Sequence, residues 1–78
     1  MPASENGPRV EQNDPGSYGA KLRVYREAAG RTQGGIAERI GVPRNTYVRW
    51  ENDRLAPKAK YLRALAAALG CELSDVVP

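Results

Sequence analysis

The side chains with the clearest chemical potential in this chain are basic groups gathered in its middle section. The 78 residues carry 12 Lys and Arg against 9 Asp and Glu, for a formal net charge of +3. Ten of the basic residues fall within residues 18–61, together with four acidic ones. Guanidinium and ammonium groups pair with phosphate oxygens, so this distribution favours a polyanion as partner. Solvated helix faces rich in arginine are the alternative explanation.

The sequence contains few residues suited to catalysis. There is no histidine, and Cys71 is the single cysteine, so neither an imidazole base nor a Cys/His metal site can be built. The glycines at 30, 34 and 35 do not form a phosphate-loop or dinucleotide-binding fingerprint. We therefore expect no enzyme, no metal and no cofactor. Cys71 is interpreted as a small, partly buried apolar residue.

Two features of the chain bear on its organisation and location. Residues 1–17 are rich in Pro and Gly and contain Val10 as their main apolar residue, which predicts a disordered tail ahead of one domain at 18–78. The longest apolar run, residues 64–69, is far shorter than the ~20 residues of a membrane helix. With a lone cysteine and no leader pattern, the expectation is a cytoplasmic protein without a membrane partner.

The elements that must position the basic groups are helices. Apolar residues recur at helical spacing, most clearly at Leu62, Leu65, Ala66 and Leu69, and strand-like alternation is absent. Ser17 and Thr32 are placed to cap the starts of the first two helices. Glycines at 30, 41 and 70 are placed to end the first, second and fourth. The pattern predicts an all-α, compact domain of five short helices.

The third and fifth helices have less regular boundaries. Pro43 fits the first position of the third helix, which then extends to about residue 52, where an Asn-Asp pair closes it. The last short helix contains Leu73, Val76 and Val77 and is capped by Ser74 or lacks a formal cap. Tyr47 and Trp50, three residues apart, are expected in the core, with stacking on nucleic-acid bases as the alternative.

Two short helices joined across residues 41–43 are the sequence signature of a helix-turn-helix. The major groove of B-DNA is about as wide as an α-helix. A helix presented there by its N-terminal end brings two or three side chains to base edges, while the preceding helix crosses the phosphate backbone. The segment 32–50 therefore predicts binding to duplex DNA.

The same segment resembles the phage repressor/Cro-type (XRE-like) family of helix-turn-helix regulators. The resemblance rests on an ordered series of motifs: Thr32-Gln33-x-x-Ile36-Ala37-Glu38-Arg39-Ile40-Gly41-Val42-Pro43-Arg44-Asn45-Thr46-Tyr47-x-Arg49-Trp50-Glu51-Asn52, then Pro57 and Leu62-x-x-Leu65-Ala66-x-x-Leu69-Gly70. It covers about residues 18–77. It implies a lambda-repressor-like DNA-binding domain with its recognition helix at about 43–52.

By position in this family, Arg44, Asn45 and Arg49 are implied to contact DNA bases. Their chemistry suits that role, because Arg pairs bidentately with guanine and Asn with adenine. Solvated surface is the alternative for the two arginines, and helix capping is the alternative for Asn45.

A further set of residues is implied to contact DNA phosphates. Gln33 lies at the start of the second helix, where the helix N-terminus also favours an anion, although a purely capping role is the alternative. The other members follow on the third helix and on the loop after it: Thr46, Asn52, Arg54 and Lys58.

The family also implies a structural ion pair between Arg26 of the first helix and Glu51 at the end of the third. Such a pair would orient the recognition helix without touching DNA. Two unrelated surface charges are the alternative.

Two positions depart from the family pattern. Gly34-Gly35 replaces good helix formers, which is explained either by close approach of the helix start to phosphates or by tolerated drift. Asp53 replaces the usual glycine and adds a negative charge near the expected phosphate contacts, which puts contact by Asn52 in doubt.

Together these features predict a small sequence-specific transcriptional regulator, of the repressor kind, that binds double-stranded DNA as a homodimer. Exposed parts of Leu73, Val76 and Val77 are the candidates for the dimer contact. The alternative is an antitoxin or adaptor, in which the same fold binds a partner protein and DNA contact matters less.

Overall fold

The computed structural model describes residues 16–78, and this part of the chain is all-helical. Five α-helices and one short 3-10 helix follow one another along it: α1 (Tyr18–Ala28), α2 (Gln33–Ile40), α3 (Arg44–Glu51), η2 (Ala59–Tyr61), α4 (Leu62–Leu69) and α5 (Leu73–Val76). The prediction of a five-helix all-α domain is confirmed. The expected tail falls almost entirely on residues 1–15, which lie outside the described residues.

The helices begin at side chains that accept the first free backbone N–H groups. The Ser17 hydroxyl accepts from the N–H of Ala20 at 3.1 Å, and the Thr32 hydroxyl accepts from Gly35 at 2.9 Å, both as predicted. The expected cap of α5 at Ser74 is wrong. Glu72 is the N-cap there and forms a reciprocal capping box with Asp75, because each carboxylate accepts from the other residue's N–H.

The turn between α2 and α3 sets the helix-turn-helix geometry. Gly41 ends α2 in the left-handed region at φ +89°, which a residue with a Cβ adopts only with strain. Pro43 is the N-cap of α3, with extended backbone, and not its first helical residue as expected. The fixed φ of proline is compatible with both positions, so the helix itself begins one residue later, at Arg44.

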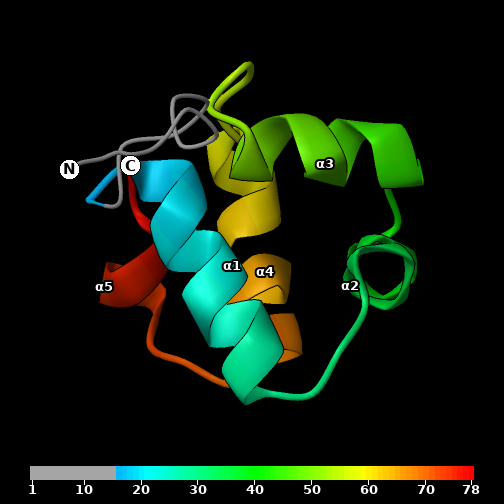
Figure 1. The fold of residues 1–78 in the computed structure, drawn as a ribbon, viewed down its shortest axis with the longest axis horizontal. Helices are drawn as coiled ribbons and strands as arrows, with labels where there is room; N and C mark the ends of the chain where they lie inside the picture. The colour runs from blue at the N-terminus through cyan, green and yellow to red at the C-terminus, as the bar shows by residue number, and fades with distance from the viewer. Residues whose placement is uncertain (1–15) are drawn as a thin grey trace, which may run out of the picture.

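The core lies where α1, α2, α3 and α4 meet (Figure 1). Its members share an exposed fraction of 6% or less: Leu22, Ile36, Ala37, Tyr47, Trp50, Leu65, Ala66, Ala68, Leu69 and Val76. The rings of Tyr47 and Trp50 pack edge to face, with centroids 5.9 Å apart. The prediction that both aromatic residues belong to the core is confirmed.

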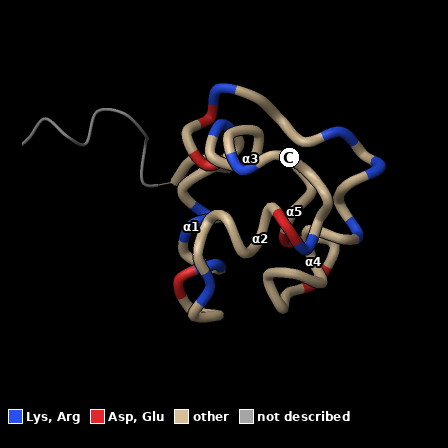
Figure 2. Tube along the Cα trace, turned by 90° about the vertical axis from the view of Figure 1, so that its right-hand side faces the viewer, with Lys and Arg blue, Asp and Glu red and all other residues tan. Residues whose placement is uncertain are grey.

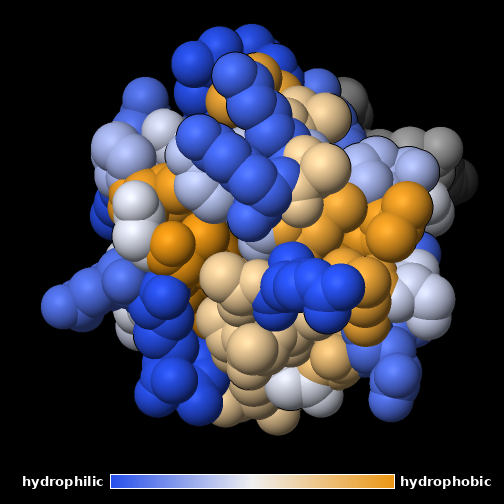
Figure 3. All heavy atoms as spheres, turned by 180° about the vertical axis from the view of Figure 1, so that it is seen from behind, coloured by the Kyte–Doolittle hydropathy of each residue, from blue (hydrophilic) through white to orange (hydrophobic). Residues whose placement is uncertain are grey.

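The C-terminal helix closes this core from one side. Val76 is fully buried, and its carbonyl oxygen accepts a hydrogen bond of 2.6 Å from the Tyr18 hydroxyl of α1. Val76 is therefore wrong as a candidate for a dimer contact. Leu73 and Val77 remain 39% and 50% exposed. On the rear face, hydrophobic surface is interrupted by hydrophilic side chains (Figure 3).

Candidate nucleic-acid interface

The recognition helix expected from the sequence presents its two sides to different environments. Arg44, Asn45 and Arg49 are all exposed, whereas Tyr47 and Trp50 on the other side of α3 are fully buried. The N-terminal end of α3 points away from α1, toward the outer edge of the molecule beside α2 (Figure 1). The side chains suited to base recognition are thus exposed to solvent, and Arg44 and Asn45 lie at that outer end of α3.

Basic residues continue from α3 along the segment that leads to α4. Lys and Arg positions mark the end of α3 nearest the viewer, the loop after α3 and the beginning of α4 (Figure 2). Arg54 and Lys58, expected at phosphates, are exposed, and Thr46 and Asn52 are partly buried. The residues expected at phosphates thus lie on α3 and on the segment that directly follows it.

Gln33 connects the two helices of the motif. Its amide nitrogen donates to Oε1 of Glu51 at 3.0 Å, and its amide oxygen accepts from Nη2 of Arg44 at 3.2 Å. Gln33 is therefore more than a residue of the capping region. It links the first residue of α3 to the buried carboxylate at the other end of the same helix.

Glu51 is the centre of a buried polar cluster. Its side chain is fully buried, and Nε and Nη2 of Arg26 donate to its two oxygens at 2.6 and 3.3 Å. The Tyr47 hydroxyl donates to Oε2 at 2.6 Å. Arg26 and Glu51, expected as partners, thus lie in a bidentate pair, which is the strongest geometry available to these groups.

The protonation of this cluster follows from its contacts. Burial alone would raise the pKa of Glu51, but hydrogen bonds from Arg26, Tyr47 and Gln33 outweigh it and the pKa is lowered. The hydrogen bond to Glu51 raises the pKa of Arg26. Burial, and then the bond to Glu51, raise the pKa of Tyr47, so its hydroxyl stays a donor. The cluster is consequently a stable ion pair at neutral pH.

The start of α1 is fastened to the end of α3, which the sequence did not indicate. A Cβ on Gly19 would overlap the carbonyl oxygen of Glu51 and lie 2.7 Å from that of Trp50, so only glycine allows this approach. The backbone N–H of Gly19 donates to Oδ1 of Asp53 at 2.8 Å. Asp53 itself adopts the left-handed conformation, with φ +59°. Its carboxylate therefore caps a helix 34 residues earlier in the chain.

The two glycines at the start of α2 are not equivalent. A Cβ on Gly35 would lie 3.1 Å from the Thr32 hydroxyl and crowd the cap of the helix. A Cβ on Gly34 would meet only the Arg44 side chain, at an ordinary 3.7 Å. Packing within the described residues thus gives a reason for Gly35 and none for Gly34.

Comparison with known proteins assigns the family. The family model described as helix-turn-helix matches residues 22–76. A protein named as an uncharacterized HTH-type transcriptional regulator, from Methanothermobacter thermautotrophicus, is 39% identical over 51 residues, which are 65% of this chain and 74% of that protein. The chain belongs to this helix-turn-helix family of DNA-binding regulators. The resemblance expected from the sequence is confirmed.

Within residues 16–78, none of the helices has the length and apolar character needed to traverse a lipid bilayer.

Proposed function

We propose that this protein is a non-enzymatic transcriptional regulator that recognises a specific sequence of double-stranded DNA, with α3 in the major groove. The proposal rests on one observation, namely that one side of α3 is exposed and the other side is buried in the core. Three side chains suited to base edges are exposed on it, while Tyr47, Trp50 and Glu51 anchor its other side. A rigid helix with exposed Arg and Asn side chains is what direct readout requires.

In this proposal, Arg44, Asn45 and Arg49 contact bases, and a second group of side chains contacts phosphates. Thr46 lies on α3 between the base-contacting residues, and Asn52, Arg54 and Lys58 follow it. Gln33 holds Arg44 and presents its remaining amide hydrogen near the N-terminus of α2, where a phosphate is favoured. Phosphate contacts fix the register of the protein on DNA, and base contacts supply the specificity.

We further propose that the protein acts as a repressor in the cytoplasm and binds DNA as a homodimer. Two recognition helices about 34 Å apart would read half-sites separated by one helical turn. Leu73 and Val77, which are exposed at the C-terminal end, are candidates for the contact between the two copies. Sedimentation analysis with and without DNA, together with the spacing of half-sites in selected DNA, tests this part.

Selection of bound sequences from a random DNA pool, followed by gel shifts with variants, tests the main proposal. Arg44→Ala and Arg49→Ala should each weaken binding to the best site by ~1–3 kcal/mol and relax preference at one base pair. Arg39→Ala is the matched control, because Arg39 is an exposed arginine at the end of α2 opposite to Gln33. If neither variant differs from the control, the base contacts are wrong.

The same experiment addresses the antitoxin or adaptor function. That alternative predicts weak DNA binding without sequence preference, so the selection would return no common site. A selected site with conserved half-sites supports the regulator instead.

A further inference from the structure

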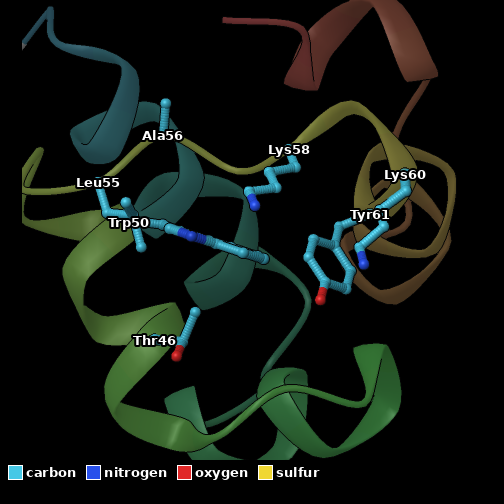
Figure 4. A pocket seen from close by; sticks show the side chains of 7 residues that line it. All are labelled: Thr46, Trp50, Leu55, Ala56, Lys58, Lys60 and Tyr61. Carbon is cyan, nitrogen blue, oxygen red and sulfur yellow. The ribbon is translucent and has the colours of Figure 1, made fainter.

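We propose that the cavity between α3 and the segment leading into α4 binds a small carboxylate with a compact apolar body. The cavity has a volume of about 200 Å³. Its lining residues come from α3, from the loop after it and from η2: Thr46, Trp50, Leu55, Ala56, Lys58, Lys60 and Tyr61 (Figure 4). The two halves of this surface differ in chemistry, and each half selects one part of the ligand.

The apolar half is made by aromatic rings and short aliphatic groups. The rings of Trp50 and Tyr61 lie side by side, with centroids 5.8 Å apart. Leu55 and Ala56 extend this wall from the loop, and Leu55 is 42% exposed. An apolar ligand group bound here removes surface of Leu55 and of the partly exposed Tyr61 ring from water, which favours binding in proportion to the area covered.

The polar half carries positive charge and no negative charge. Lys58 and Lys60 line the cavity, and none of its lining residues is acidic. The ammonium group of Lys58 points toward the Trp50 ring (Figure 4), whereas that of Lys60 lies 5.2 Å from the centre of the Tyr61 ring. Within residues 16–78, neither the Lys58 ammonium group nor the Thr46 hydroxyl takes part in a side-chain hydrogen bond or an ion pair with the protein. Both groups are available to an anion.

The size of the cavity limits the ligand. Pockets for drug-sized molecules measure roughly 300–1,000 Å³. A cavity of about 200 Å³ admits a smaller body, such as a branched chain of four or five carbons or one ring. The ligand class is therefore a short branched or aromatic carboxylate.

The inference rests on the proposed function in one respect, namely its consequence for DNA binding. Thr46 and Lys58 are also proposed phosphate contacts. A carboxylate held by these groups neutralises Lys58 and occupies its side of the interface, so ligand and DNA phosphate compete. The helix-turn-helix domain would then sense a metabolite without a separate ligand-binding domain.

Titration of the 15N-labelled protein in the absence of DNA, followed by NMR, tests the site directly. Trp50 is the only tryptophan, so its indole N–H gives a single side-chain signal from the cavity wall. With 3-methylbutanoate as probe, we expect saturable shifts of this signal and of the Leu55 and Tyr61 amides. Acetate should bind about tenfold more weakly because it lacks the apolar body. The neutral analogue 3-methylbutan-1-ol should bind about fivefold more weakly because it lacks the charge.

Variants separate the two halves of the site. Leu55→Ser should lower the affinity for 3-methylbutanoate about fivefold because it removes an apolar wall. Lys58→Ala should have an effect of similar size through the lost charge. Lys21→Ala, at an exposed lysine of α1 outside the cavity, should bind the ligand like the wild type. Equal binding of 3-methylbutanoate, acetate and inorganic phosphate would overturn the proposal, since it would show only a bare anion site. Absence of saturable shifts would overturn it as well.

Gel shifts at constant ionic strength test the consequence. 3-Methylbutanoate should weaken DNA binding by the wild type several-fold, and the same weakening of DNA binding by Leu55→Ser should require about fivefold more ligand. The two proposals can fail independently. A protein that binds the ligand but no DNA contradicts the proposed function alone. A protein that binds its DNA site and ignores the ligand contradicts this inference alone.

Discussion

The two ends of α3 use the same kinds of side chain in opposite ways. At its C-terminal end, Glu51 is fully buried, and its oxygens accept hydrogen bonds from Arg26, Gln33 and Tyr47. At its N-terminal end, Arg44 and Asn45 are exposed, and the Arg44 guanidinium donates a hydrogen bond of 3.2 Å to the amide oxygen of Gln33. A charged group buried with partners fixes geometry, whereas an exposed one is available to a ligand.

The difference shows how a domain this small can hold a recognition helix rigidly. Its apolar core is limited, because a chain of this length hides only ~60% of the surface that it exposes when unfolded. The Glu51 cluster adds directional contacts between α1, α2 and α3, and a shift of α3 would break several of them together. Gln33 belongs to both regions, since one amide bonds to Glu51 and to Arg44.

The largest effect is expected from breaking the buried pair. Arg26→Ala removes the bidentate partner of the buried Glu51 carboxylate and leaves only the more distant Arg23 as a cation, so we expect a loss of about 3–5 kcal/mol in the free energy of unfolding. Urea denaturation followed by circular dichroism measures it. Arg23→Ala is the control: Arg23 lies 3.9 Å from the same carboxylate but is half exposed, so it should cost no more than ~1 kcal/mol. Equal losses in both variants would refute the distinction between buried and exposed charges.

The pH dependence of stability should also originate in the buried region. Glu51 has an ordinary pKa of 4.5, and its pKa in the folded protein is lower. Its contribution to stability is therefore complete above that ordinary value and is lost as the pH falls through the folded-state pKa. The difference in unfolding free energy between the wild type and Glu51→Gln should be largest near neutral pH. It should become smaller as the pH falls below the ordinary pKa of the carboxyl group. A difference that stays constant over this range would contradict the assignment.

A substitution at Gly19 should disrupt the close contact between α1 and the end of α3. The methyl group of Gly19→Ala would clash with the backbone carbonyl of Glu51. Because a backbone group cannot rotate away, we expect the variant to be less stable by about 1–3 kcal/mol. DNA affinity measured at a temperature where the variant is folded should also fall, because α1 and α3 must separate. A variant as stable as the wild type would show that this contact is looser than the structure indicates.

The sequence was sufficient for features that depend on local spacing. Apolar periodicity and the glycines at 30, 41 and 70 predicted the helices, because a left-handed helix end favours a residue without a Cβ. Trp50 was placed in the core by its spacing from Tyr47. The family pattern supplied what spacing could not, namely the expectation that Arg26 and Glu51 are partners.

The contacts that fasten the site were beyond sequence reasoning, since they join residues far apart in the chain. The bond between Gly19 and Asp53 spans 34 residues, and neither residue carries a local signal for it. Asp53 was interpreted as an unhelpful charge near the phosphate contacts, and the structure instead gives its carboxylate a backbone donor. The role of Gln33 likewise depends on how α2 and α3 pack. The capping box of Glu72 and Asp75 did have a signal, the three-residue spacing of two acidic groups, and it was missed.

The smallest predicted effect concerns the exposed region and decides why Gly34 is a glycine. Gly34→Ala meets only the Arg44 side chain, at 3.7 Å, so the substitution should raise the free energy of unfolding by about 0.4–1 kcal/mol through the unfolded state. Gly35→Ala is the matched comparison, and it should stabilise less because its Cβ crowds the Thr32 cap. DNA affinity then separates the two explanations. If the stabilised Gly34→Ala variant binds DNA with unchanged affinity, the glycine is a tolerated sequence change without a function. If its affinity is reduced, the DNA backbone approaches α2 at a point where only a glycine leaves room.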